Sequence, residues 1–69
     1  MTITKDNNCV LTRLTGAQAD AIMEYTNDIF NEHKLHYDCY DLGFNLWDLK
    51  VYHTEQEHRD TIAQIVLDN

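Results

Sequence analysis

Residues 15–34 carry the pattern of a long amphipathic helix. Thr15 and Gln18 have the spacing of a capping box, in which two side chains bind each other's backbone N–H groups at a helix N-terminus. Mostly apolar residues then recur at helical spacing: Ala19, Ile22, Met23, Thr26, Ile29 and Phe30. His33 and Lys34 suit the negative end of a helix dipole. We therefore predict a helix that begins after Thr15 and ends near His33 and Lys34.

Four carboxylates lie on the opposite side of this predicted helix, and we call them the acid ridge. They follow one another at i, i+4 spacing: Asp20, Glu24, Asp28 and Glu32. With a rise of about 1.5 Å per residue, successive acids lie about 6 Å apart along the helix axis. Like charges at this spacing destabilise a helix by about 0.2–0.5 kcal/mol per pair, and no Lys or Arg interrupts the series. This pattern is typical of an ordinary solvated helix face, and it also suits an anionic surface that binds a basic partner.

Three further acids follow the ridge, and we call them the second acid patch: Asp38, Asp41 and Asp48. The whole chain has a net charge of −7, from 12 acids and 5 bases. Direct binding to nucleic acid or to an anionic membrane is therefore disfavoured, and attraction to a basic surface is favoured. Tyr25 and Tyr40 are the tyrosines that we expect to be exposed beside the acids, where they suit contact with arginine.

Strand patterns surround the predicted helix. Two short runs, 3–5 and 9–14, are separated by Asp-Asn-Asn turn chemistry and predict an N-terminal hairpin. Alternation over 35–40 predicts a strand, and 41–43 is a plausible turn. A longer strand is expected over 44–53, where the apolar alternation breaks in the middle, as a bulge or a strand covered on both faces would explain.

A second capping box begins at Thr54 and predicts a helix that runs to about Leu67. The expected fold is a single α+β domain, residues 1–69, of approximate order β(β)αββα. It has a small antiparallel sheet of three to four strands, with two helices on one face.

Candidate metal and catalytic groups are weak. His33, His36 and Cys39 are zinc-ligand types, but their spacing crosses a predicted helix–strand junction. Cys9 and Cys39 lack a nucleophile elbow, and no glycine-rich phosphate loop is present. A chain of 69 residues rarely forms a water-excluding pocket. We therefore predict no enzyme activity and no cofactor, with a small zinc-binding domain as a remote alternative.

The leading hypothesis is a small acidic inhibitor or regulator that covers a basic, nucleic-acid-binding surface of a larger protein. In size and charge layout the chain resembles the small acidic proteins by which bacteriophages block host restriction, CRISPR or transcription machinery. No motif identifies a family. We expect a cytoplasmic location, in the host if phage-encoded, because residues 1–8 lack a secretory pattern. The alternative is a homodimeric or adaptor module that uses an apolar sheet face around Trp47, Leu49 and Val51.

Overall fold

The computed structural model describes residues 1–33 and 35–69, with the side chains of 30–33 left out of the description. In chain order the elements are β1 (Thr2–Ile3), β2 (Cys9–Thr15), α1 (Gly16–His33), β3 (Tyr37–Gly43), β4 (Leu46–Val51) and α2 (Gln56–Asp68). The strands form one antiparallel sheet of order β1-β2-β4-β3. The predicted α+β fold, its element order and the N-terminal hairpin are therefore confirmed.

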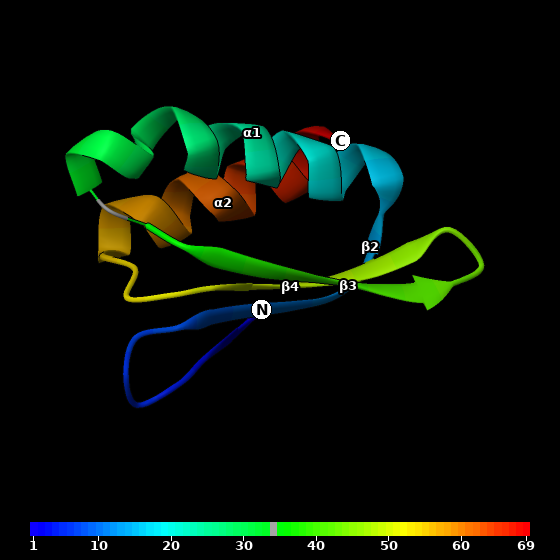
Figure 1. Ribbon diagram of the computed structural model, residues 1–69, viewed down its shortest axis with the longest axis horizontal. Helices are drawn as coiled ribbons and strands as arrows, with labels where there is room; N and C mark the ends of the chain where they lie inside the picture. The colour runs from blue at the N-terminus through cyan, green and yellow to red at the C-terminus, as the bar shows by residue number, and fades with distance from the viewer. Residues whose placement is uncertain (34) are drawn as a thin grey trace.

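The two helices lie side by side on one face of the sheet (Figure 1). The β3–β4 hairpin extends beyond the helices at one end, and the opposite face of the sheet carries no element in the described chain (Figure 1). The molecule therefore has a covered sheet face, an uncovered sheet face and an outer helical surface.

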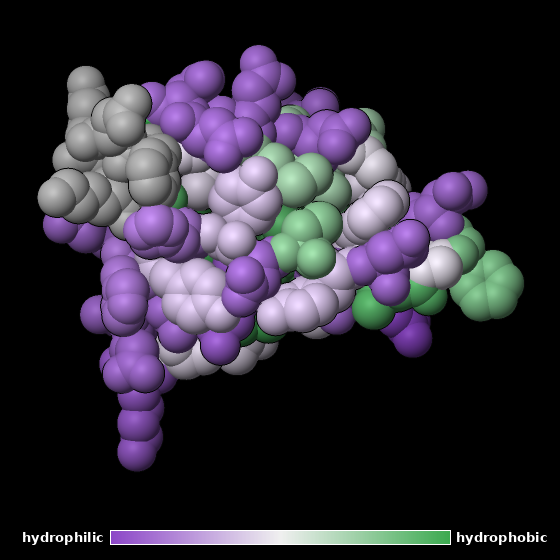
Figure 2. All heavy atoms as spheres, viewed as in Figure 1, coloured by the Kyte–Doolittle hydropathy of each residue, from purple (hydrophilic) through white to green (hydrophobic). Residues whose placement is uncertain are grey.

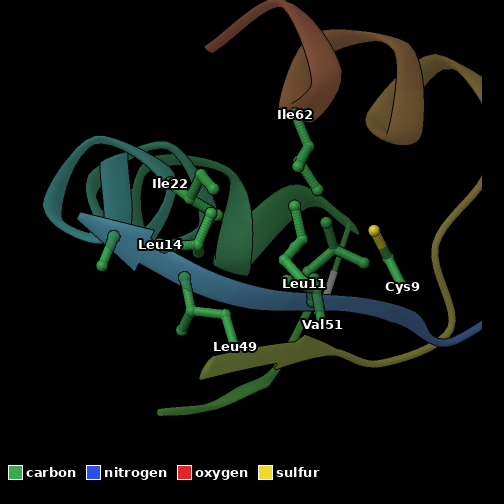
Figure 3. Close-up of a cluster of buried hydrophobic side chains, with 9 residues drawn as sticks. Cys9, Leu11, Leu14, Ile22, Leu49, Val51 and Ile62 are labelled. Atoms are coloured by element: carbon green, nitrogen blue, oxygen red, sulfur yellow. The ribbon is translucent and has the colours of Figure 1, made fainter. Parts of the chain in front are cut away.

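The hydrophobic core lies between the helices and the covered face of the sheet. Figure 3 shows Ile62 of α2 pointing towards residues of the strands, with Ile22 of α1 beside Leu14. The buried apolar residues are Cys9, Leu11, Leu14, Ala19, Ile22, Leu35, Leu49, Val51 and Ile62. Full burial of an aliphatic side chain contributes about 1.5–3 kcal/mol, so this shared core fixes both helices on the sheet.

The predicted capping box at the start of α1 is confirmed. The backbone N–H of Gln18 donates to Thr15 Oγ1 at 3.2 Å, and the N–H of Thr15 donates to Gln18 Oε1 at 3.0 Å. Gln18 Nε2 also donates to the backbone oxygen of Val66 at 3.1 Å, which ties the first turn of α1 to the last turns of α2.

The second helix begins one residue later than the sequence pattern predicts. Glu55 is the N-cap, and its N–H donates to Nδ1 of the buried His58 at 3.0 Å. Thr54 is used elsewhere, since its Oγ1 donates to the backbone oxygen of Asn7 at 2.7 Å. This bond joins the entrance of α2 to the N-terminal hairpin.

The predicted turn at 41–43 is wrong, because β3 continues to Gly43 and the chain reverses at Phe44 and Asn45. Both turn residues have left-handed backbone, with φ of 53° and 61°, and Gly43 pairs with Leu46 across the turn. The break in alternation therefore arises because Phe44 belongs to the turn and the next strand begins at Leu46. One bulge lies in β3, where Leu42 is the extra residue between two paired positions, and another register shift lies in β2 between Leu11 and Leu14.

The apolar interface expected around Trp47, Leu49 and Val51 is also corrected. Leu49 and Val51 are fully buried in the core, and Trp47 packs against it. These side chains face the helices because residues two apart on a strand share a face. Leu49 and Val51 therefore offer no free apolar surface to a partner, and Trp47 is partly buried.

Candidate functional site

The acid ridge lies on the exposed side of α1. Asp20, Glu24 and Asp28 are exposed, whereas the side chain of Glu32 lies outside the described residues. The opposite side of the helix is fixed, since Ala19, Ile22 and Thr26 are buried, and so the ridge is held on a rigid support. Figure 2 shows hydrophilic side chains along the outer side of the helical layer.

The second acid patch is divided between the two faces of the sheet. Residues directly opposite one another on antiparallel strands have their side chains on the same face. Asp41 pairs with Trp47, whose side chain packs against the core, and so Asp41 lies on the helix side. Asp38 and Asp48 are on the uncovered face, where they pair with Lys50 and Tyr40 respectively.

Asp41 lies on the same side of the sheet as the ridge. Burial raises the pKa of the Cys39 thiol, and the charges of Asp41 and Asp20 raise this pKa further. The charges of one residue of β3 and one of α1 therefore both act on a thiol that lies on the helix side of the sheet. The anionic surface that α1 and β3 form on the helical side consequently consists of the ridge together with Asp41, and the exposed acids of α2 lie on the neighbouring helix.

The uncovered face carries mixed charge and internal hydrogen bonds. Asp38 accepts hydrogen bonds from the hydroxyls of Tyr52 and Tyr40, the latter at 3.4 Å. The hydrogen bond to Asp38 is the main cause that raises the pKa of Tyr52. Lys50 Nζ lies 5.0 Å from the centre of the Tyr52 ring, as in a cation–π contact. This base beside the acids makes the uncovered face a poorer anionic surface than the helical side.

Asp48 has a structural partner. Its Oδ1 accepts the backbone N–H of Arg13 at 3.0 Å. Arg13 lies in the irregular part of β2 between Leu11 and Leu14 and has a φ of 53°. The carboxylate therefore satisfies a backbone donor at a bulge.

The two tyrosines expected beside the acids are also separated. Tyr25 is half-buried and packs against the core, so it offers little free surface. Tyr40 is 53% exposed, but it lies on the uncovered face away from the ridge.

The proposed zinc ligands do not converge. His36 and Cys39 are three residues apart in extended chain, so they point to opposite faces, and the side chain of His33 lies outside the described residues. One cluster of ligand types exists in the described chain, formed by Glu55, Glu57 and His58. Both acids are exposed and His58 Nδ1 already accepts the N-cap N–H, which is the arrangement of a helix cap.

Neither cysteine has the properties of an activated nucleophile. Cys9 and Cys39 are free thiols. Burial is the largest cause that raises the pKa of each one, which favours the protonated form over the reactive thiolate.

The tip of the β3–β4 hairpin, residues 42–45, is a feature that the sequence patterns missed. Phe44 is 97% exposed, and a bulky side chain in left-handed backbone costs about 1–2 kcal/mol. Two-residue hairpin turns of this kind favour Asn-Gly. The sequence does contain a signal for a turn at this place, because Gly43 and Asn45 flank Phe44 and both residue types tolerate positive φ.

Comparisons of the chain with models of protein families, with curated proteins and with solved structures give no match. Within the described residues, no helix is long and apolar enough to cross a membrane.

Proposed function

We propose that this protein is a small acidic inhibitor that binds a basic, nucleic-acid-binding surface of a larger protein and thereby excludes the nucleic acid. The observation that carries the proposal is the acid ridge, of which Asp20, Glu24 and Asp28 are exposed, on a helix without any Lys or Arg between residues 16 and 33. Asp41 extends this anionic surface from the neighbouring strand. The protein acts in the cytoplasm, without catalysis and without a cofactor.

The spacing of the ridge supports nucleic-acid mimicry. Successive acids advance about 6 Å along the helix axis, at about 1.5 Å per residue. One DNA strand carries a phosphate for about every 3.4 Å of its axis, and the winding of the strand makes the distance between phosphates larger than this rise. A row of i, i+4 residues also runs obliquely across a helix, at about 26° to its axis. A rigid, inclined row of anions of similar spacing suits a groove that follows a phosphate backbone.

Charge governs the binding in this proposal. Complementary fields accelerate association, and salt weakens contacts between exposed charges. The uncovered face contributes less, since Lys50 lies among its acids and Asp48 is hydrogen-bonded to the β2 bulge.

The test uses three purified complexes with basic nucleic-acid channels: a restriction endonuclease, a CRISPR nuclease loaded with guide RNA, and a bacterial RNA polymerase. We call these the test panel. A ridge variant, Asp20→Lys/Glu24→Lys/Asp28→Lys, should lose binding to the panel member that the wild-type chain binds. A matched variant of α2, Glu57→Lys/Asp60→Lys/Asp68→Lys, reverses the same number of exposed acids and should retain most of the affinity. Equal losses in the two variants would contradict a specific role of the ridge.

A further inference from the structure

We propose that Phe44 is an anchor that inserts into an apolar pocket of the partner, beside the basic surface that the acid ridge contacts. This inference rests on the proposed function and adds a second, uncharged element to the interface. It assigns the hairpin tip to recognition rather than to folding.

The conformation and exposure of Phe44 support this assignment. Its side chain is 97% exposed, so it contributes almost nothing to the core. Its backbone is left-handed, which is uncommon for a bulky residue and is better served by Asn or Gly. A turn selected for folding alone would not place phenylalanine here, whereas aromatic residues are preferred anchors at protein interfaces.

The tip is held in place before any partner binds. Gly43 and Leu46 pair in the strand ladder on either side of the turn, and Asp41 Oδ1 accepts the N–H of Gly43 at 2.8 Å. An aromatic side chain has few rotamers, and a preformed turn loses little further freedom on binding. Figure 2 shows a hydrophobic protrusion at this end of the molecule, beyond the helical layer.

The residues around Phe44 indicate the chemistry of the pocket that we expect on the partner. Leu42 in the same tip is 45% exposed, so the surface to be covered is apolar. Asp41 lies three residues away, on the side of the acid ridge, and would meet a basic rim. The expected site on the partner is therefore an apolar pocket for one benzyl group, bordered by Lys or Arg.

A second copy of this chain is a less suitable occupant. A mostly apolar, open pocket of about 230 Å³ lies between β2 and α2, beside Leu11, Leu14, Val66 and Leu67. However, each chain carries a net charge of −7, and two copies repel one another. Charge complementarity instead favours the basic partner.

The test compares Phe44→Asn, Phe44→Leu and Leu67→Asn for affinity to the test panel over a range of salt concentrations. Phe44→Asn should weaken binding by at least about tenfold, as loss of an interface anchor does, with an unchanged dependence on salt. Phe44→Leu should retain most of the affinity because it keeps an apolar side chain. Leu67, which is 79% exposed on α2, supplies the matched control and should be replaceable without effect. The thermal midpoint of Phe44→Asn should equal or exceed that of the wild-type chain. A loss of binding in this variant then does not result from unfolding.

The outcomes separate this inference from the proposed function. Wild-type affinity in Phe44→Asn would overturn the anchor and leave the ridge in place. Loss of binding in Phe44→Asn but not in the ridge variant would contradict the proposed function. A wild-type chain that binds no panel member contradicts both. Self-association of the wild-type chain, abolished by Phe44→Asn in sedimentation experiments, would overturn the inference in favour of a second copy.

Discussion

Asp41 lies opposite Trp47 in the β3–β4 ladder, and this pairing places the Asp41 carboxylate on the helix-covered side of the sheet. Asp38, on the same strand, lies opposite Lys50 and therefore points to the uncovered side. Asp38 and Asp41, three residues apart on one strand, thus belong to different surfaces of the protein. The anionic surface that we assign to partner binding is one-sided, and it consists of the ridge together with Asp41.

The two aspartates of β3 should differ in their effect on binding. Asp41→Asn should weaken affinity for the bound panel member by about threefold, the effect of one exposed charge. Its side-chain oxygen remains available to the N–H of Gly43, so the turn is retained. Asp38→Asn is the matched control and should leave the affinity unchanged. Calorimetric titration measures both, and an equal loss in the two variants would contradict the assignment.

Neutralising the ridge should stabilise the free protein. Asp20→Asn/Glu24→Gln/Asp28→Asn removes three i, i+4 repulsions, 20/24, 24/28 and 28/32, each worth about 0.2–0.5 kcal/mol at low salt. The first turn of α1 contains no acid, so little favourable interaction with the helix dipole is lost. A domain of this size gains about 4–8 °C in thermal midpoint per kcal/mol. Circular dichroism melts should show a higher midpoint at low salt and a smaller difference at high salt. An unchanged or lower midpoint at low salt would mean that repulsion among the acids of the ridge does not destabilise the protein.

The hydroxyl of Tyr52 should titrate above the ordinary tyrosine pKa of 10.0, because it donates a hydrogen bond to the Asp38 carboxylate. The pKa in the folded chain is then higher than in the unfolded chain. The associated stability is fully present below the unfolded pKa and is lost as the pH rises through the folded pKa. Nuclear magnetic resonance of the tyrosine rings measures this pKa, and Asp38→Asn should lower it. The same pKa in both proteins would show that the hydrogen bond does not form in solution.

The docking of α2 on the sheet should depend on Ile62. Ile62 is fully buried, and truncation of such a residue to alanine costs about 2–5 kcal/mol. A chain of 69 residues has a total stability of roughly 3.5–10 kcal/mol, at about 0.05–0.15 kcal/mol per residue. Ile62→Ala should therefore shift denaturant unfolding strongly to lower concentration, whereas Leu67→Ala, on the exposed side of α2, should change it little. Similar midpoints for the two variants would exclude the packing described for α2.

The parts of the fold that the sequence predicts are those with local signals. The capping box at Thr15 and Gln18 and the apolar spacing behind it depend on residues within a few positions of one another, and α1 follows this pattern. The N-terminal hairpin has clear turn chemistry in Asp6, Asn7 and Asn8, and the chain reverses there, with Asn7 at a φ of 61°.

The errors arise where a local pattern competes with long-range contacts. Phenylalanine is a residue type that favours strands. Phe44 nevertheless lies in the turn, because Gly43 pairs with Leu46 across it. Threonine is a residue type that favours the N-cap position. The hydroxyl of Thr54 instead donates a hydrogen bond to the backbone oxygen of Asn7, which is distant in sequence. Asp38 and Asp41 lie on opposite faces of the sheet because of the strand register and of the face that the helices cover. Neither can be predicted from the spacing of the acids alone.

The most direct test of the central claim is competition between this protein and double-stranded DNA for the panel member that binds it. We expect the wild-type chain to displace the DNA, rising salt to abolish the displacement, and Asp20→Lys/Glu24→Lys/Asp28→Lys to leave the DNA bound. A partner that holds DNA and the wild-type chain at the same time, or equal displacement by the ridge variant, would contradict the account.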